Sequence, residues 1–593
     1  MFASQRISCG SRYRCFLSRL GVVLCLILTT ALQAEASNAL RYLPEDALGF
    51  VLVRNLDNVD AKVGRLTQLF GLNFPAPLTF AKFATGLGEG IQQQGDLLVA
   101  LIPGSKEAPE PQPMVLLPVN DYVRFAASIH GDASGEICRV AVAGESVLVA
   151  KFGEYALLMN VEHRETLELM LGLQQSPVAS LEPLESWIDE NDVVATLMPK
   201  GLEMLLELGK KTVAQRLEQL DGKRDDLQLS ALLRQMKMRT EMLQWTMGFF
   251  ESEIELVAVA VSLDEDTNLS ISKRVLLKEG GKLISSTRQK IDVVSPLLDY
   301  ADQPFVLAGG GPFPEHWADT LSLMSRTFMQ RMPELNGLEE LDDAHWKKLQ
   351  ESYLSFMKNL KSFSMMVLPG KEGEPLFGNI FGVMKSTNSA EHLESYRKAM
   401  ETWNEIMENS TSDIALDYEI SAKTIASKKA YEIVIDVASA ARDPNVPSFN
   451  WLLEAMFGED GKMHQLLVAA NQQTLVYGMA SEKQLMPLIK QVEEGESGLY
   501  DSAEVQVTLK LAPADAPWKL LISPQGCVTW VKRIVDEFLA HLVGQTPDIP
   551  DFDACPPVGL SLNLVDGRIE ADLVCPVETL NALAAYIKKC QAL

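Results

Sequence analysis

The chain has 593 residues, of which 47% are hydrophobic, 22% charged and 7% aromatic. This composition is typical of a globular protein and excludes a disordered or collagen-like chain. Its length corresponds to about three to five domain-sized units. The formal net charge of -26 argues against nucleic acid or an anionic membrane surface as a partner.

The first 36 residues have the three parts of a secretory signal peptide. Four arginines and no acidic residue precede an apolar run at residues 20–32. Ala34-Glu35-Ala36 then places small residues at positions −3 and −1 of a cleavage site after Ala36. The alternative is an uncleaved membrane anchor, although the apolar run is shorter than the roughly 20 residues of a transmembrane helix.

These features predict an exported protein of the periplasm or cell envelope. Residues 1–36 contain four arginines and one glutamate, so the rest of the chain carries 49 basic and 78 acidic residues, a net charge of -29. No later segment holds 18 uninterrupted apolar residues, so we expect no stable membrane insertion once the signal is removed.

Five cysteines remain after the predicted cleavage, and they do not form the dense framework of a small disulfide-rich protein. They are Cys138, Cys527, Cys555, Cys575 and Cys590. Four of them fall in the last 67 residues, where one or two disulfide bonds could form. The spacing leaves their pairing open.

The clearest predicted element is a β-hairpin near the C-terminus. Apolar and polar residues alternate on both sides of Asp566-Gly567. A two-residue Asp-Gly turn favours type I′, because both of its central residues need positive φ. Such a turn places all the apolar residues on one face. The expected pairs are Val565 with Arg568, Leu564 with Ile569, Leu562 with Ala571 and Leu560 with Leu573.

A helix is expected to follow this hairpin, and the same layout recurs upstream. The helix opens at Pro576. Its predicted apolar stripe consists of Leu580, Leu583, Ala584 and Ile587. Earlier hairpins are predicted at 97–102 with 114–119, at 256–263 with 269–277, and at 363–368 with 376–384. A second unit, a strand that runs into a helix, begins near Phe50, Val193, Phe305 and Trp518.

The spacing of these units predicts an internal duplication. The strand starts at Phe50 and Phe305 are 255 residues apart, and the hairpins at 97 and 363 are 266 residues apart. A duplication with a period near 260 explains both spacings. The alternative is that common strand–helix patterns recur by chance. We therefore expect two similar halves in tandem, at 37–290 and 291–593.

The remaining patterns indicate an α+β fold of antiparallel sheets with packed helices. Two further strands are predicted from alternating residues, one at Ile414, Leu416, Tyr418 and Ile420 and one at Val505, Val507, Leu509 and Leu511. Alternation of this kind indicates sheets with one exposed face. Helical patterns at 201–220 and 227–250 predict a helical hairpin.

Two glycine-rich stretches resemble nucleotide-binding loops. Gly309-Gly310-Gly311 follows a strand, but the Lys-Ser/Thr of a phosphate-binding loop is absent. We interpret it as a flexible strand–helix connection. Gly86, Gly88 and Gly90 have the wrong spacing for a dinucleotide fingerprint and are interpreted as a loop.

Two acidic stretches could be mistaken for calcium sites. Asp264, Asp266 and Asn268 match the first positions of a calcium loop, but the required glycine and bidentate glutamate are missing. This stretch is better explained as a solvated hairpin turn. The aspartates Asp548, Asp551 and Asp553 are better explained as an acidic surface loop.

Catalytic and metal-binding motifs have no local support. The seven histidines, at 130, 163, 316, 345, 392, 464 and 541, lack zinc-binding spacing, and no G-x-S-x-G elbow is present. The set His130, Asp132 and Ser134 lies in one turn, whereas triads assemble in space. The methionines Met236, Met238 and Met242 are better explained as packing residues than as copper ligands. We therefore predict no catalytic residue, no cofactor-binding residue and no metal ligand.

Three segments, LPEDALGFVLVRNL, VLLPVNDYVRFAASI and GESVLVAKFGEYALLM, together resemble a class of exported bacterial proteins of unknown function. The resemblance covers roughly residues 40–170. It implies export and the fold, and it carries no catalytic residue.

The sequence thus favours an exported, non-catalytic binding or structural module. Its expected partner is a protein or another component of the envelope. The alternative is an envelope hydrolase whose site is assembled from distant residues between the two halves.

Overall fold

The computed structural model describes residues 38–592 except 73–77, 80–81, 83–88, 105–109, 143, 173–177, 222–229, 288–296, 298, 315–342, 409–416, 437–449, 495–497 and 543–546. The predicted signal peptide therefore lies outside the described residues, and so does most of the predicted break near 291–303. The chain divides into two compact units. Unit 1 comprises Met1–Leu205 and Glu255–Val275, and unit 2 comprises Leu206–Ile254 and Leu276–Leu593.

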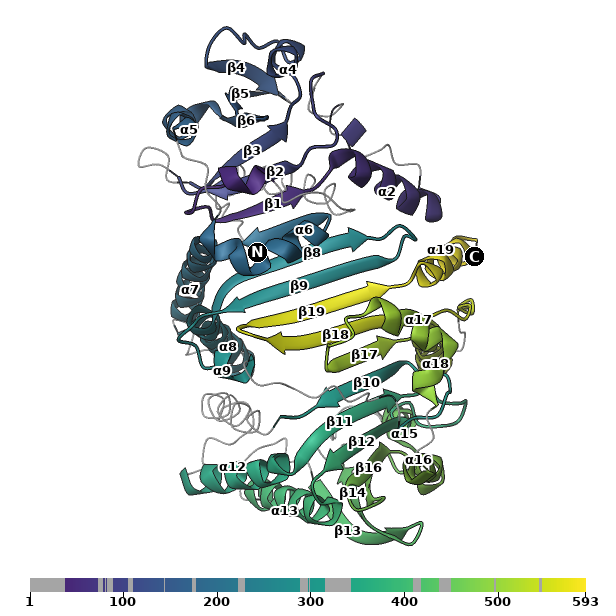
Figure 1. Cartoon of the computed structure of the whole chain (residues 1–593). Helices are drawn as coiled ribbons and strands as arrows, with labels where there is room; N and C mark the ends of the chain where they lie inside the picture. The colour runs from purple at the N-terminus through teal and green to yellow at the C-terminus, as the bar shows by residue number, and fades with distance from the viewer. Residues whose placement is uncertain are drawn as a thin grey trace, which may run out of the picture. The chain divides into compact units, whose positions relative to one another are not determined.

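Unit 1 is built on one antiparallel sheet (Figure 1). Its neighbouring strands run in the order β4 (Ile137–Val142), β5 (Glu145–Phe152), β6 (Tyr155–Asn160), β3 (Gln112–Pro118), β2 (Leu97–Ile102), β1 (Gly49–Val53), β7 (Val193–Leu197) and β8 (Ile254–Leu263). Strand β9 (Leu269–Leu277) follows β8 after a tight turn. The hairpins predicted at 97–119 and 256–277 are confirmed in position.

Short helices connect the strands of unit 1. They are η1 (Asn38–Tyr42), α2 (Leu56–Leu69), α4 (Tyr122–Ser128), η2 (Val161–His163), α5 (Arg164–Leu171), η3 (Ala179–Leu184) and α6 (Glu185–Glu190). Helix α4 follows the hairpin of β2 and β3, as the recurring layout predicts. The Asp121 carboxylate caps it by accepting a hydrogen bond from the backbone N–H of Arg124 at 3.0 Å. Its Phe125 is fully buried in the core of the unit.

The strands of unit 2 also pair antiparallel to one another. Its strands run in the order β13 (Asp417–Ile425), β14 (Lys428–Asp436), β15 (Met463–Ala469), β16 (Thr474–Met479), β12 (Ile380–Ser386), β11 (Leu360–Val367), β10 (Leu307–Pro312), β17 (Trp518–Ile522), β18 (Val558–Val565) and β19 (Arg568–Cys575). Residues Ile414 and Leu416 of the predicted strand lie outside the described residues, whereas Tyr418 and Ile420 belong to β13.

The helices of unit 2 include α8 (Ser230–Glu253), α9 (Ile284–Thr287), α12 (Asp343–Lys358), α13 (Ser389–Glu408), α15 (Asn450–Phe457), α16 (Glu482–Glu494), η4 (Leu499–Asp501), α17 (Ala503–Leu511), α18 (Pro524–Leu542) and α19 (Val577–Gln591). The predicted helical hairpin corresponds to α7 (Pro199–Asp221) and α8, which are joined by the ion pair of Lys210 with Glu251. None of the helices in the described part of the chain has both the length and the apolar character that a bilayer crossing needs.

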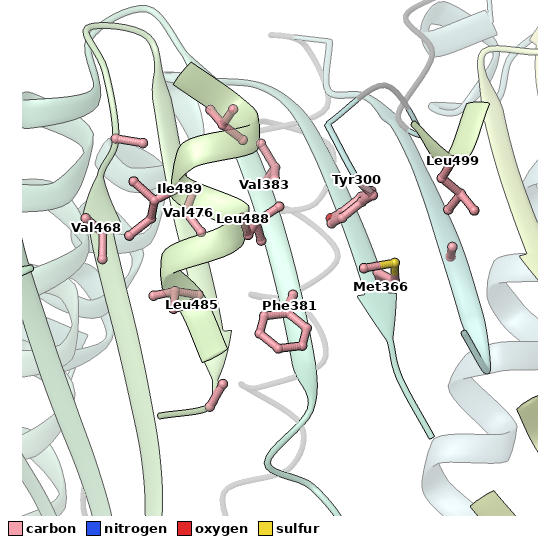
Figure 2. Packing of buried hydrophobic residues seen from close by; sticks show 14 of the residues in the cluster. Tyr300, Met366, Phe381, Val383, Val468, Val476, Leu485, Leu488, Ile489 and Leu499 are labelled. Carbon is pink, nitrogen blue, oxygen red and sulfur yellow. The ribbon is translucent and has the colours of Figure 1, made fainter. Parts of the chain in front are cut away.

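The core of unit 2 forms where α16 packs on the sheet (Figure 2). Leu485, Leu488 and Ile489 repeat at helical spacing, so they share the face of α16 that meets Val476 of β16. Nearby, the buried hydroxyl of Tyr300 lies 3.1 Å from that of Ser364, so each satisfies the other. Antiparallel sheets and packed helices confirm the predicted α+β class.

The C-terminal hairpin has the predicted register. Gly559 pairs with Val574, and all four predicted pairs between β18 and β19 occur. Asp566 and Gly567 have φ values of 41° and 82°, as a type I′ turn requires. The stripe expected on α19 is partly wrong: Leu580 and Ala584 are buried, but Leu583 and Ile587 are each 39% exposed.

The strand predicted at Val505–Leu511 is wrong, because these residues form helix α17. Val505 and Thr508, which lie one helical turn apart, are both buried, and the Thr508 hydroxyl donates to the carbonyl of Pro557 at 2.6 Å. Glu504 and Lys510 lie at the helix ends that favour their charges. Tertiary packing therefore overrides the alternating pattern of this short segment.

The glycine run 309–311 is not a flexible connection, because it lies inside strand β10, between β11 and β17. A Cβ atom at Gly309 would lie 2.3 Å from the carbonyl oxygen of Lys519. One at Gly311 would lie 2.6 Å from the indole ring of Trp518. Glycine is needed here because neighbouring groups approach the backbone closely.

Candidate functional site

A pocket of about 300 Å³ lies within unit 2. It is lined by residues of strands β13 to β16, the end of α15, the start of α16 and the segment 375–378. Its volume is at the lower end of the range typical of small-ligand sites. We therefore take this pocket as the candidate functional site.

One wall of the pocket is apolar. It consists of Phe377, Phe457, Met463, Leu466 and Met479. The rings of Phe377 and Phe457 stack with their centres 6.0 Å apart, and Phe377 also contacts Trp530 edge-on. This wall can cover an aromatic or aliphatic group.

Hydrogen bonds to neighbouring helices hold the segment that carries Phe377. The backbone N–H groups of Leu376 and Phe377 donate to the last turn of α15, at 3.0 Å each. The guanidinium of Arg533 on α18 donates to the carbonyls of Pro369 and Glu374, at 2.6 Å each. The apolar wall is therefore fixed before any ligand binds.

The pocket also has a charged wall, to which Lys423, Glu432 and His464 contribute. The Lys423 ammonium lies 2.6 Å from one oxygen of Glu432. The other Glu432 oxygen lies 3.2 Å from Nδ1 of His464, and Nε2 of His464 lies 2.7 Å from Asp460. When His464 is protonated, positive and negative side chains alternate along this series, so they stabilise one another.

The environment of His464 favours its charged form. Burial opposes the charge, but the hydrogen bonds to Asp460 and Glu432 outweigh burial and raise the pKa of His464. The pKa of Glu432 is lowered despite burial, because Lys423 and His464 hydrogen-bond to its carboxylate. As an imidazolium, His464 donates through both nitrogens and has no lone pair with which to act as a base.

The hydroxyl group of Ser481, which lines the pocket, is also engaged in a hydrogen bond. Ser481 precedes α16, and its hydroxyl and backbone N–H both donate to the side-chain oxygen of Gln484, at 2.7 and 2.9 Å. The Gln484 amide in turn donates to Asn379 at 3.0 Å. The bond from the Ser481 N–H to the Gln484 side chain is one half of a helix-capping box, so Ser481 has a structural role that does not require reactivity.

The acidic residues that could be mistaken for calcium ligands form hydrogen bonds and ion pairs with other side chains. Both carboxylate oxygens of Asp264 accept hydrogen bonds from Asn268, at 2.8 and 2.7 Å, and close the turn between β8 and β9. Asp551 pairs with Lys532 at 2.9 Å, and Asp553 with Lys589 at 2.8 Å. Within the residues that the structure describes, no group of three His, Cys, Asp or Glu side chains could hold a metal ion.

The histidines whose side chains are described do not lie together at one site. His163 and His392 are buried separately, and His130 lies in a turn in which Asp132 accepts from the backbone of Ser134. His316 and the side chains of His345 and His541 lie outside the described residues. His464 alone of the described histidines lines the pocket, and its Glu432 contact depends on a strand pairing that the histidine spacing does not reveal.

The other candidate residues that the structure describes do not line the pocket. Met236 is half-buried on α8 and Met242 is 42% exposed, while the Met238 side chain lies outside the described residues. Gly90 lies in a loop, whereas Gly86 and Gly88 lie outside the described residues. All five described cysteines carry free thiols.

Comparison of the chain with protein-family models, curated proteins and solved structures found no match. No relative therefore assigns a role to any residue, and the functional argument rests on the pocket itself.

Proposed function

We propose that the protein is an exported, non-catalytic binding module of the periplasm or cell envelope, and that the pocket of unit 2 is its binding site. The observation that carries this proposal is the charged wall, in which both nitrogens of His464 are engaged by carboxylates. With Ser481 bound to Gln484, the pocket has an apolar wall to bind a group but no free nucleophile–base pair to transform it.

The expected ligand is a small amphipathic group of an envelope component. Its apolar part would lie against Phe377, Phe457 and Met479. Its polar part would meet the half-exposed ammonium of Lys423, which has N–H donors beyond the one used by Glu432. An aromatic or thioether-lined wall beside one charged group selects such amphipathic shapes.

The test compares two methionine-to-tryptophan variants. Met479→Trp fills the pocket, whereas Met486→Trp places the same ring at an exposed position of α16 and serves as the control. The folded proteins are incubated with envelope extract, and retained components are identified by native mass spectrometry. We expect a component that the wild type and Met486→Trp retain and Met479→Trp does not, and that is released with unchanged mass. Equal retention by all three proteins would contradict the site, and release of a cleaved component would favour the hydrolase.

We further propose that the chain carries two similar α+β halves in tandem, as the residue spacing predicts. The strand order β4-β5-β6-β3-β2-β1-β7-β8 in unit 1 corresponds to β14-β15-β16-β12-β11-β10-β17-β18 in unit 2. Strand β13 then has no counterpart in the described part of unit 1. The boundaries 37–290 and 291–593 stay predictions.

Matching hydrogen bonds support this correspondence. The backbone N–H of Leu48 donates to Leu101 and its carbonyl accepts from Met198, while Val306 makes the same bonds with Val367 and Ser523. This correspondence matches Phe50 to Ala308, three residues beyond the match to Phe305 that the strand starts predict. A crystal structure in which the strands of the two units superpose with Phe50 on Ala308 would support the duplication. Failure of these strands to superpose would contradict it.

A further inference from the structure

The end of the chain brings two cysteines to the same buried corner of unit 2. Cys575 is the last residue of β19, and Cys555 lies three residues before β18. The pairing of Gly559 with Val574 places the first residue of β18, Val558, next to Cys575. Figure 1 shows β18 beside β19, with α19 following directly after β19. Only Pro556-Pro557 separates Cys555 from this pairing.

Thr579 connects the two cysteine segments. It lies four residues after Cys575, in the first turn of α19. Its hydroxyl donates to the carbonyl of Pro556 at 2.6 Å, and its side chain also hydrogen-bonds to the Cys555 thiol. Cys555 is therefore held against the first turn of α19, which begins two residues after Cys575.

Both thiols are buried in this corner, with Cys555 7% and Cys575 8% exposed. Burial raises the pKa of each thiol to about 11, and a negative charge on Cys555 would raise that of Cys575 further. The two sulfur atoms therefore sense each other's charge. Once the protein has folded, only a small fraction of the Cys555 and Cys575 thiols is deprotonated, and both thiols are shielded from solvent.

We propose that Cys555 and Cys575 form a disulfide bond while the protein folds, linking the segment before β18 to the end of β19. The proposal assumes the oxidising compartment that the predicted export provides. The other three cysteines are differently placed. Cys138 belongs to unit 1, Cys527 is half-buried on α18, and Cys590 is exposed on α19.

The chemistry is a thiol–disulfide exchange with glutathione disulfide or a protein disulfide as oxidant. One cysteine thiolate attacks the oxidant, forming a mixed disulfide and releasing one thiolate of the oxidant. The second cysteine thiolate then attacks the mixed disulfide, forming the Cys555–Cys575 bond and releasing the other oxidant thiolate. The two released thiolates take up the two protons that the cysteines lost, and the oxidant gains the two electrons.

The test uses the chain without residues 1–36, unfolded in denaturant with reductant and then refolded in a mixture of reduced and oxidised glutathione. Free thiols are blocked with N-ethylmaleimide, and non-reduced peptides are mapped by mass spectrometry. We expect a peptide that joins Cys555 to Cys575, with Cys138, Cys527 and Cys590 blocked or carrying glutathione. Blocked thiols at both positions, or a link from either one to another cysteine, would overturn the proposal.

Two further arms separate the proposal from its assumptions. Protein that is folded first under reducing conditions should form the link at least tenfold more slowly, because its thiols are buried. Cys575→Ser should abolish the linked peptide, whereas the control Cys590→Ser should keep it. Refolding in vitro does not depend on export, so an intact Met1 end found in cells would refute the export prediction without changing this result.

Discussion

Gly526 lies so close to Phe305 that a Cβ atom at position 526 would be 1.8 Å from the Phe305 carbonyl oxygen. Gly201 has the same relationship to Leu48, also at 1.8 Å. Each glycine is the third residue of a helix that begins with Pro-x-Gly directly after a strand, α18 after β17 and α7 after β7. No side chain fits at either point, so both helices leave their strands along a path that only glycine permits.

We therefore expect Gly526→Ala and Gly201→Ala each to lower the free energy of unfolding by about 2–4 kcal/mol, because the backbone must shift to admit the methyl group. The measurement is urea-induced unfolding followed by circular dichroism. The controls are Gly64→Ala and Gly248→Ala, which lie in helices. Beyond their own stretch of helix, no atom of the described residues lies within 4 Å of the new methyl group. The free energy of unfolding of these controls should rise by up to about 1 kcal/mol. If all four variants behave alike, the close contact does not determine stability.

The second prediction concerns acid stability. His392 is fully buried against the ring of Phe356, at a centre-to-centre distance of 4.6 Å. Among the residues that the structure describes, neither ring nitrogen has a hydrogen-bond partner. Burial lowers the pKa of His392 to about 4, from 6.5. As the pH falls, His392 therefore binds a proton at a higher pH in the unfolded chain than in the folded one. The folded state loses up to about 3 kcal/mol of stability between pH 6.5 and 4.

His392→Phe should flatten this loss, because no buried imidazole would then resist protonation. The measurement is the free energy of unfolding at several pH values between 7 and 4. The control is His130→Asn, which changes an exposed histidine in a turn and should leave the acid slope as in the wild type. An unchanged slope in His392→Phe would show that other groups control acid stability.

The third prediction concerns a buried ion pair in unit 1. Lys62 and Asp192 are almost fully buried, with Nζ 3.8 Å from the carboxylate. Both bind the backbone of Leu263, whose carbonyl accepts from Lys62 at 2.5 Å and whose N–H donates to Asp192 at 2.9 Å. Burial lowers the pKa of Lys62 and raises that of Asp192, so each charge depends on the other.

Lys62→Met or Asp192→Asn should each cost about 3–5 kcal/mol, because each leaves an uncompensated buried charge. The double variant should cost less than the two single variants together, as measured in a double-mutant cycle by chemical unfolding. The exposed pair Arg124–Glu89 is the control, and Glu89→Gln should cost less than about 1 kcal/mol. Additive losses at Lys62 and Asp192 would contradict the coupling.

Local rules were sufficient to predict the C-terminal hairpin from sequence. The Asp566-Gly567 turn sets the register, and every predicted pair follows from it. The alternating pattern at Val505 wrongly predicted a strand. A segment of nine residues fits the period of a strand as well as that of a helix, and packing decides between them. The Gly309–Gly311 run was misinterpreted because its reason, the approach of Lys519 and Trp518, lies more than 200 residues away in the chain.

The pocket could not be predicted for a related reason. His464 and Asp460 are four residues apart, but Glu432 joins them only through the pairing of β14 with β15. The apolar wall depends on Phe377, which a long-range contact with α15 brings into place. No short motif encodes either contact.

The fourth prediction tests export. If the signal peptide is cleaved after Ala36, protein purified from its native cells should begin at Ser37. N-terminal sequencing or intact mass gives the result directly. Ala36→Arg should block cleavage, because position −1 needs a small residue, whereas Glu35→Gln should not. An intact Met1 end on wild-type protein in the cytoplasm would refute the prediction.

The last prediction is that the protein does not bind nucleic acid at physiological salt. Its net charge is -26, or -29 without residues 1–36, and lysines near the C-terminus are paired with acids, as Lys532 is with Asp551 and Lys589 with Asp553. At this ionic strength the screening length is about 8 Å, so weak long-range attraction is already damped. A filter-binding assay with DNA and RNA should therefore show no retention at micromolar protein. The control is the double variant Asp551→Lys and Asp553→Lys, which frees two lysines and adds two more, and should show weak retention that falls steeply with salt. Salt-sensitive retention by the wild type would reveal a basic surface within the acidic total and would contradict the expected partner class.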